Sequence, residues 1–306
     1  MTDSHSDSCL GRLPDCEECS TGNENHCRNG STGTYNSRYF DPATKTFTGE
    51  KSYGGYADYH RAPSHFVFKI PDELDSADAA PMLCGGITVF SPLVRNGCGP
   101  GLKVGIVGVG GLGHFGVLFA KALKADKVVG ISRYNDKRKD VLAMGADQYI
   151  ATEDELGWED KYRRTLDLIV CTVSSSKVCH LFPLLAPIQY VSRHEGLMPE
   201  TFKQMPLSSY LKLLRINGKL VQVGLPEDAL PTLTASDFTR TGIFLGGSNI
   251  GAPHEIREML ELAAKQKVKP WVQTRDMRDA NAAVVDQNDG KARYRYTLVN
   301  GKHADI

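Results

Sequence analysis

Four cysteines near the start of the chain have the spacing of a metal site. Six, two and seven residues separate Cys9, Cys16, Cys19 and Cys27. Four thiolates on a short loop can close a tetrahedron around Zn²⁺ and leave no position open for water, as in a structural zinc site. A disulfide knot is the alternative, and it would be favoured in a secreted chain.

A second group of residues has the spacing of a dinucleotide-binding turn. Gly108, Gly110 and Gly113 form a G-x-G-x-x-G motif. The motif directly follows a short apolar strand and opens an amphipathic helix, which is the context that it needs. These glycines allow a tight turn and let the backbone approach a pyrophosphate, and the helix start offers free N–H groups and a positive dipole end. The alternative is a glycine-rich turn that serves packing alone.

The end of the second expected strand indicates which dinucleotide binds. An NAD site usually offers Asp or Glu there to the ribose 2′-hydroxyl. This chain instead has Ser132 and Arg133, with Lys137 and Arg138 shortly after. A hydroxyl and cations suit a 2′-phosphate, and arginine adds a planar fork of donors. We therefore predict NADP rather than NAD; the alternative is a solvated basic patch.

Composition argues against several classes of partner. The 306 residues carry 36 Lys+Arg and 36 Asp+Glu, so net charge gives no case for a nucleic acid or a membrane surface. The chain has no run of about 18 apolar residues, and MTDSHSDS lacks the apolar core of a signal peptide. We expect a cytoplasmic, reducing location, which favours zinc over disulfides at the first four cysteines. Three isolated cysteines, Cys98, Cys171 and Cys179, are expected to be small buried hydrophobic residues.

Strands and helices are expected to alternate along most of the chain. Residues 52–71 predict strands around a Gly-Gly turn, and residues 72–97 predict a helix capped by Asp72 or Asp75. This alternation continues to residue 268 and predicts an α/β fold with a doubly wound parallel sheet of the Rossmann type. The further expected strands are 104–107, 127–133, 147–151, 166–173 and 238–251, the helices 113–124, 137–146 and 253–268, and a helix–turn–strand unit 209–224.

One stretch, residues 178–204, does not follow this alternation. It carries three prolines and no sustained period, at a place where a short link is expected. Joining Lys177 to Met205 restores the regular sequence SSSKMPLSSYLKLLRINGKLVQVG. The stretch begins with valine, whose codons all start with GT, and ends with glutamine, one of whose codons is CAG. These borders fit a retained intron, and a real surface insertion is the alternative.

Several segments together resemble the zinc-dependent medium-chain alcohol dehydrogenases. They are GGYADYHRAPSHFVFKIP, APMLCGGITVFSPLVRNGCGPG, VGIVGVGGLGHFGV, AMGADQYIAT and EIREMLELAAKQKVKPWVQTR. They are most similar to the cinnamyl-alcohol-dehydrogenase branch and its fungal NADP-dependent members, and 178–204 has no counterpart. The resemblance implies part of a GroES-like β-rich catalytic domain at 1–78, an NADP-binding domain at 79–270, and a return to the catalytic domain at 271–306.

The resemblance also implies roles for individual residues. A structural zinc would be held by Cys9, Cys16, Cys19 and Cys27, although the first gap is longer than the family's two residues. The pairing of the strand near 241–249 across a two-fold axis implies a homodimer. The implied cofactor contacts are Gly110, Gly111 and Leu112 for the pyrophosphate, Ser132, Arg133 and Lys137 for the 2′-phosphate, and Thr88, Ser248, Asn249 and Ile250 for the nicotinamide.

Cys84 corresponds to a ligand of the family's catalytic zinc. In the family, an open-site Zn²⁺ binds the substrate oxygen while hydride passes between substrate and nicotinamide. The sequence contains no match for the family's other ligands, a first Cys and a Gly-His-Glu segment, so we expect an N-terminally truncated catalytic domain. His194-Glu195 follows Arg193 rather than Gly and is a poor replacement.

Three functions remain in competition. The first is a zinc-dependent oxidoreductase that transfers hydride between NADP(H) and a primary alcohol or aldehyde, mainly in the direction of aldehyde reduction. The alternative is a catalytically silent NADP(H)-binding protein with only a structural zinc. A zinc-free quinone-reductase-like enzyme is disfavoured because those enzymes lack the four-cysteine lobe. Hydride transfer to a model aldehyde separates the first two.

Overall fold

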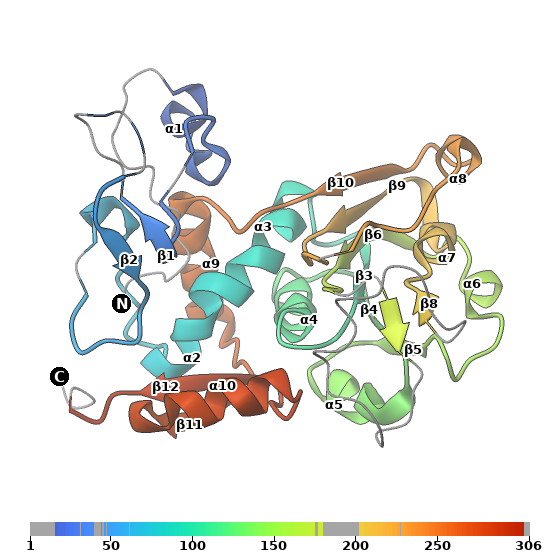
Figure 1. The fold of residues 1–306 in the computed structure, drawn as a ribbon. Coiled ribbons are helices and arrows are strands. Elements are labelled where there is room, and N and C mark those ends of the chain that lie inside the picture. Colours follow the sequence, from blue (N-terminus) through green and yellow to red (C-terminus); the bar gives the residue numbers. More distant parts are fainter. Residues whose placement is uncertain are drawn as a thin grey trace.

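A parallel sheet of six strands organises the computed structural model, which describes residues 16–30, 32–39, 44, 46, 48–60, 62–174, 177–179, 202–226 and 228–302 (Figure 1). The strand order is β10-β9-β6-β3-β4-β5. Counted along the chain from β3, successive strands are added first on one side of β3 and then, from β6 onward, on its other side, which is the doubly wound order. The direction of strand order therefore reverses between β3 and β6, and the predicted fold is confirmed. The strands are β3 (Lys103–Val107), β4 (Lys127–Ser132), β5 (Gln148–Ala151), β6 (Leu166–Cys171), β9 (Leu214–Gln222) and β10 (Phe244–Gly247).

Helices cover both faces of this sheet. Side chains alternate along β3, so that Val104 and Ile106 join one core cluster and Val107 joins the other. The first cluster includes Phe119 of α4, and the second includes Leu211 of α7. Burial on both faces explains why the central strands β3, β4 and β6 are nearly continuous apolar runs. The helices are α4 (Gly113–Ala122), α5 (Arg138–Ala143), α6 (Trp158–Lys161), α7 (Leu207–Lys212), α8 (Ala235–Thr239) and α9 (Pro253–Gln266), with the short η4 (Asn135–Lys137) before α5.

A long helix precedes the sheet and is interrupted in its middle. It runs through α2 (Ser76–Pro81), the π-helical turn η3 (Met82–Gly86) and α3 (Ile87–Arg95). Asp75 caps it, since its side chain accepts a hydrogen bond from the Ala77 N–H at 2.7 Å. By length and composition alone, Ser76–Arg95 could cross a membrane, with a mean hydropathy of 1.3. In this fold 67% of it is buried, as in a core helix.

The first lobe of the chain contains little regular structure. It holds α1 (Glu17–Ser20), η1 (Glu24–His26), η2 (Ser64–Phe66) and one antiparallel pair, β1 (Tyr35–Arg38) with β2 (Lys51–Tyr53). The predicted strands over 52–71 are therefore wrong beyond Tyr53. Gly54 turns the chain with φ +84°, and Tyr56 and Tyr59 are exposed. Phe66 and Phe68 are buried, but Phe66 ends the short helix η2 and does not lie in a strand.

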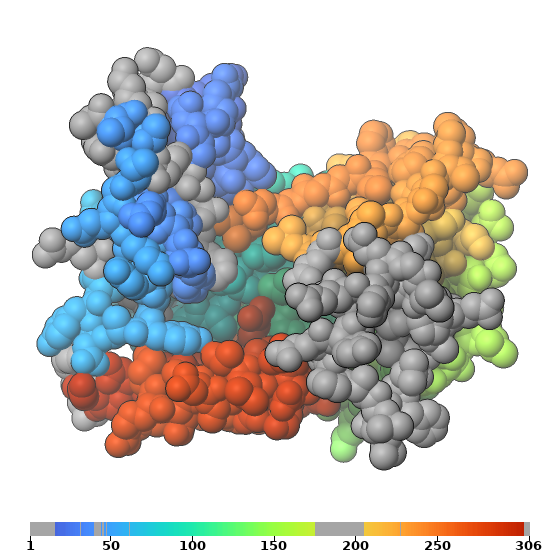
Figure 2. Space-filling view, in the orientation of Figure 1, coloured from blue at the N-terminus to red at the C-terminus, as the bar shows by residue number. Residues whose placement is uncertain are grey.

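The C-terminal segment lies beside the first lobe and under α2 (Figures 1 and 2). It consists of β11 (Val272–Asp276), η6 (Met277–Asp279), α10 (Ala280–Asn288) and β12 (Arg295–Val299), and β11 and β12 pair in parallel. The Thr297 hydroxyl donates to the Ala77 carbonyl at 2.9 Å, which ties β12 to α2. The division into domains at 78 and 270 stays a prediction.

Two details near the irregular stretch differ from or add to the predictions. The unit at 209–224 has the predicted order of helix, turn and strand, since a turn at Leu213 separates α7 from β9. The strand continues through Asn217, which adopts a left-handed φ of 59°. Upstream, β7 (Lys177–Cys179) pairs antiparallel with β8 (Phe202–Gln204), with Lys177 opposite Gln204. This pairing brings together the two ends of the stretch 178–204, whose residues 180–201 lie outside the described residues.

The isolated cysteines behave as predicted where the structure describes them. Cys98 is 9% exposed and Cys171 is fully buried. Burial raises the pKa of both thiols, to about 12 and about 11, so they stay protonated at neutral pH. The side chain of Cys179 lies outside the described residues.

Candidate dinucleotide site and zinc lobe

The glycine-rich turn lies where β3 ends and α4 begins, next to the reversal of strand order. Gly108 has a φ of +85°, and its carbonyl accepts a hydrogen bond from the Thr172 hydroxyl at 2.6 Å. A Cβ at Gly113 would collide with the Gly108 carbonyl oxygen, so this position needs glycine. A Cβ at Gly110 would meet nothing within 4 Å. The turn is therefore tight on one side and open at Gly110, as a cradle for a pyrophosphate must be.

Arg295 of β12 reaches this turn from the far end of the sequence. Its Nε donates to the Gly111 carbonyl at 2.8 Å, and its guanidinium also lies against Gly85 in the π-helical turn. Burial lowers the pKa of Arg295, and the nearby Cys84 thiolate opposes that effect. Sequence reasoning missed this residue, because only the fold brings position 295 to the turn.

Cys84 sits in the π-helical turn, a distortion that is frequent at functional sites. Its carbonyl accepts a hydrogen bond from the Thr88 hydroxyl at 2.8 Å. Among the described residues, one group of three or more side chains could jointly hold a metal, that of Cys16, Cys19 and Cys27, and Cys84 does not belong to it. The described residues therefore do not fit a catalytic zinc at Cys84, and no reaction step is derived through one. His194 and Glu195 lie outside the described residues.

The predicted 2′-phosphate residues lie together where β4 ends. Ser132 is its last residue, and the exposed Arg133 stands over the Tyr134 ring, 5.7 Å from its centroid. The Lys137 ammonium donates to the Val109 carbonyl at 3.0 Å, so it lies beside the glycine-rich turn. Burial lowers the pKa of Lys137, and the charges of Arg293 and Arg133 lower it further against the opposing effect of Asp136.

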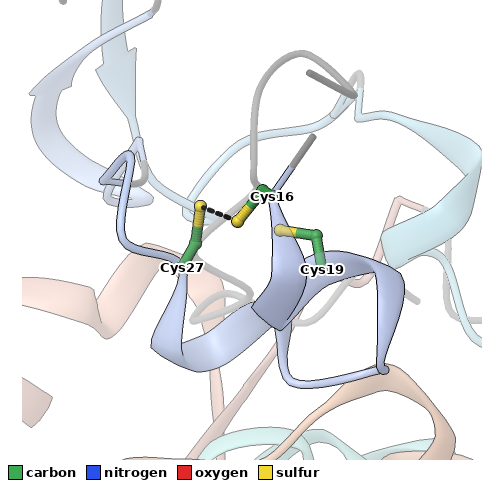
Figure 3. A group of neighbouring side chains, drawn as sticks. All are labelled: Cys16, Cys19 and Cys27. Atoms are coloured by element: carbon green, nitrogen blue, oxygen red, sulfur yellow. Dashed lines mark hydrogen bonds between the residues drawn. The ribbon is translucent and has the colours of Figure 1, made fainter. Parts of the chain in front are cut away.

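Three of the four predicted structural-zinc ligands converge in the first lobe (Figure 3). The sulfur atoms of Cys16, Cys19 and Cys27 lie within 4.8 Å of one another, and those of Cys16 and Cys27 are 3.5 Å apart. Tetrahedral thiolate ligands at about 2.3 Å from Zn²⁺ are about 3.8 Å from each other, so this geometry fits zinc. Cys9, the fourth predicted ligand, lies outside the described residues.

The turn predicted to face the nicotinamide is held by that lobe and by the sheet. The Asn25 side-chain amide donates to the Asn249 carbonyl at 2.8 Å. The Ser248 N–H donates to the Gln222 carbonyl at 3.1 Å, and Ile250 is buried with a φ of 38°. Asn25 was not predicted as a site residue; its place between two cysteines of the lobe was the signal available.

A hollow of about 240 Å³ lies elsewhere, in the first lobe. Aromatic side chains, including Tyr39, Tyr59 and Phe66, line it, and none of the predicted cofactor residues does. We assign it no part in the dinucleotide site.

Known proteins resemble this chain over nearly its whole length, although no family model matches it. NADP-dependent alcohol dehydrogenase 6 of Saccharomyces cerevisiae is 39% identical over 294 residues, which are 95% of this chain and 71% of that protein. Probable cinnamyl alcohol dehydrogenase 3 of Oryza sativa subsp. japonica is 34% identical over 92% of this chain and 67% of its own length.

Solved structures agree with these relatives. The cinnamyl alcohol dehydrogenase of Sorghum bicolor superposes with a TM-score of 0.77 at 30% identity, over 94% of this chain and 72% of that one. The CAD of Helicobacter pylori, solved in complex with NADP(H), gives a TM-score of 0.73 at 28% identity, over the same shares of the two chains.

Proposed function

Because this chain belongs to the zinc-dependent medium-chain alcohol dehydrogenases, in the branch of the NADP-dependent and cinnamyl alcohol dehydrogenases, we propose that it works as an NADP-dependent alcohol dehydrogenase. It transfers hydride between NADP(H) and a small primary alcohol or aldehyde, mainly in the direction of aldehyde reduction. The observation that carries the proposal is the cradle at Gly110, which lies at the reversal of strand order between β3 and β6.

The turn holds the pyrophosphate through backbone groups and the start of α4. Gly110 leaves room for the phosphates, and the first N–H groups of α4 have no partners within the helix and attract negative charge. Gly108, Gly111 and Leu112 complete the cradle, and Gly113 lets the helix approach the strand. Thr88 and the turn Ser248–Ile250 lie on the nicotinamide side. When bound there, the nicotinamide supplies or accepts the hydride.

The choice of NADP over NAD follows from the end of β4. A carboxylate at this position would repel a 2′-phosphate, whereas Ser132 and Arg133 offer a hydroxyl and a cation. Lys137 lies beside the glycine-rich turn, where its ammonium donates a hydrogen bond to the Val109 carbonyl. A partly buried ammonium has lost some of its hydration, so a phosphate that joins it recovers that loss.

A structural zinc in the first lobe completes the proposal. Cys16, Cys19 and Cys27 supply three thiolates, and Cys9 is the fourth ligand that the family pattern names. The lobe has short helices and few buried apolar side chains, so a metal gives it the stability that a core would otherwise supply. A cytoplasmic location belongs to this proposal, since thiolate ligands need reducing surroundings.

We also propose that two copies associate through β10. This strand is the edge of the six-stranded sheet, with Phe244 59% exposed, so its outer backbone groups are free to pair with another strand. A two-fold axis at this edge would join two sheets into one, which is consistent with the homodimer that the family resemblance implies.

Fluorescence and absorbance together test the proposal on the 306-residue chain. NADPH fluorescence measures binding, and the loss of absorbance of NADPH with cinnamaldehyde measures turnover. Binding together with turnover supports the dehydrogenase. Binding without turnover supports the alternative, a silent NADP(H)-binding protein, for this chain. If NADPH does not bind at all, the assignment of the glycine-rich turn is wrong.

A further inference from the structure

A third cation lies beside the predicted 2′-phosphate residues. It is Arg293, which comes from the C-terminal segment just before β12, whereas Arg133 and Lys137 follow β4. Arg293 was not part of the sequence-based site, since it is 160 positions away from Arg133 in the chain. Its position follows from two contacts that hold Tyr294 and Arg295 to the dinucleotide-binding unit, and from one that holds its own backbone to β11.

The first two contacts fix the two residues that directly follow Arg293, Tyr294 and Arg295. Tyr294 is 2% exposed, and its hydroxyl donates to the Asp140 carboxylate at 2.9 Å. Asp140 follows Lys137 by three residues at the start of α5, so the two side chains share one face of that helical turn. Arg295 in turn donates to the Gly111 carbonyl at 2.8 Å. The segment 293–295 therefore runs from α5 to the glycine-rich turn.

The third contact anchors Arg293 itself. Its backbone N–H donates to the Gln273 side chain at 3.1 Å, and its guanidinium donates to the carbonyls of Gly290 and Ala292, both at 3.2 Å. The side chain is exposed, so it can turn toward a ligand. Lys137 lies three residues before Asp140, the partner of Tyr294, so the contacts of Tyr294 and Arg295 bring Arg293 to the side of the unit where Lys137 lies. In agreement with this, the charge of Arg293 contributes to the lowered pKa of Lys137.

These three cations share a lack of ion-pair partners among the described residues. Within the described residues, Arg133, Lys137 and Arg293 have no carboxylate oxygen in an ion pair, although Asp136 is near enough to act on Lys137 through its charge. Lys291, two residues before Arg293, is different, since it pairs with Asp286 at 2.8 Å and with Asp289 at 3.0 Å. A cluster of cations that repel one another is stabilised by a bound anion.

We propose that Arg293 is a specificity-determining residue that contacts the 2′-phosphate of NADP(H), together with Arg133 and Lys137. The inference rests on the proposed function, because it places the adenosine end of the cofactor at β4. The 2′-phosphate is the group that distinguishes NADP from NAD, and it carries nearly two negative charges near neutral pH. A guanidinium meets such a group with two parallel N–H donors.

Binding constants for NADPH and NADH, measured by fluorescence titration, test this without relying on catalysis. We expect Arg293→Gln to weaken NADPH binding about fivefold to tenfold, because one charge-assisted hydrogen bond at an exposed site is lost, and to change NADH binding less than about twofold. Arg293→Lys should restore part of the loss. Lys291→Ala is the matched control, because the Lys291 ammonium already forms ion pairs with Asp286 and Asp289. This variant should leave the NADPH and NADH binding constants unchanged.

The ratio of the NADPH and NADH binding constants shows whether Arg293 contacts the 2′-phosphate. Equal weakening of NADPH and NADH by Arg293→Gln, or no weakening of either, overturns the role of Arg293 while the parent protein still binds NADPH. Repeating the titration with 2′,5′-ADP and with 5′-AMP gives the same contrast without the nicotinamide. A parent protein that binds neither dinucleotide overturns the proposed function itself, and the role of Arg293 with it. Equal thermal midpoints of all variants confirm that the fold is intact.

Discussion

Replacing Glu255 by glutamine tests how the helices beside the cofactor turn are held together. Glu255 lies in the first turn of α9 and is 3% exposed. Its carboxylate accepts hydrogen bonds from the Ala252 N–H at 2.8 Å and the Ser91 hydroxyl at 3.0 Å. Arg95 donates twice more, at 2.6 and 3.0 Å. Since Ser91 and Arg95 belong to α3, this one carboxylate ties α3 to α9.

The magnitude follows from what glutamine cannot supply. Glu255→Gln keeps the size of the side chain but removes its charge and replaces one acceptor oxygen by an NH₂ group. Removing one partner of a buried ion pair costs about 3–5 kcal/mol. The Arg95 side chain is 33% exposed and can be partly hydrated, so we expect the lower end, about 3 kcal/mol. At roughly 2–4 °C per kcal/mol, the thermal midpoint falls by about 6–12 °C.

The same carboxylate gives the effect a pH dependence. Burial by itself raises the pKa of Glu255, but the hydrogen bonds from Arg95, the Ala252 N–H and Ser91 outweigh it, so the pKa lies below its ordinary value of 4.5. A group with a lowered folded pKa stabilises the protein fully above its unfolded pKa, and this stability is lost as pH falls through the folded pKa. The difference between parent and Glu255→Gln should therefore shrink below about pH 4.5.

Urea unfolding followed by circular dichroism at neutral and acidic pH measures both effects. Glu258→Gln is the matched control, because Glu258 lies on the same helix and is exposed. The control should stay within about 0.5 kcal/mol of the parent. The reasoning fails if Glu255→Gln is as stable as Glu258→Gln at neutral pH, or if the gap between parent and Glu255→Gln widens as pH falls.

Three further predictions concern the cofactor turn, the zinc lobe and the irregular stretch. Gly110→Ala should fold like the parent but bind NADPH at least about tenfold more weakly, because the new methyl group fills the space for the pyrophosphate. Gly113→Ala should instead destabilise the fold, because its methyl group collides with the Gly108 carbonyl. Fluorescence titration measures the binding and thermal melting measures the stability, and equal melting temperatures of the two variants would contradict the prediction. Cys16→Ser should lose about one zinc ion per chain in elemental analysis and expose the lobe to protease, and unchanged zinc content would exclude Cys16 as a ligand. Deleting residues 178–204 should give a folded protein of equal or greater thermal stability, because the pairing of β7 with β8 already brings the two ends of this stretch together. An insoluble deletion variant would show that the stretch is needed for folding.

The sequence could predict the parts of the fold that neighbouring residues encode. The strand at 103–107, the glycines after it and the cap at Asp75 all depend on contacts within a few residues, and the structure has each of them. The doubly wound parallel sheet was also predicted, because alternating strands and helices have few ways to pack. The alternating pattern at 52–71 misled after Tyr53, because a period of two predicts a strand only where one face is buried, and Tyr56 and Tyr59 are exposed.

The sequence by itself determined which chemistry belongs to the chain: the glycine-rich turn, the hydroxyl and cations after β4, and the closely spaced cysteines. The tertiary structure alone decided which distant residues complete these sites. Arg295 reaches Gly111 across 184 positions, and Asn25 reaches Asn249 across 224. The spacing of residues in the sequence does not predict such pairs. Their distance in space depends on how α2, α3 and α9 pack between the first lobe and the sheet, and not on the number of residues between them.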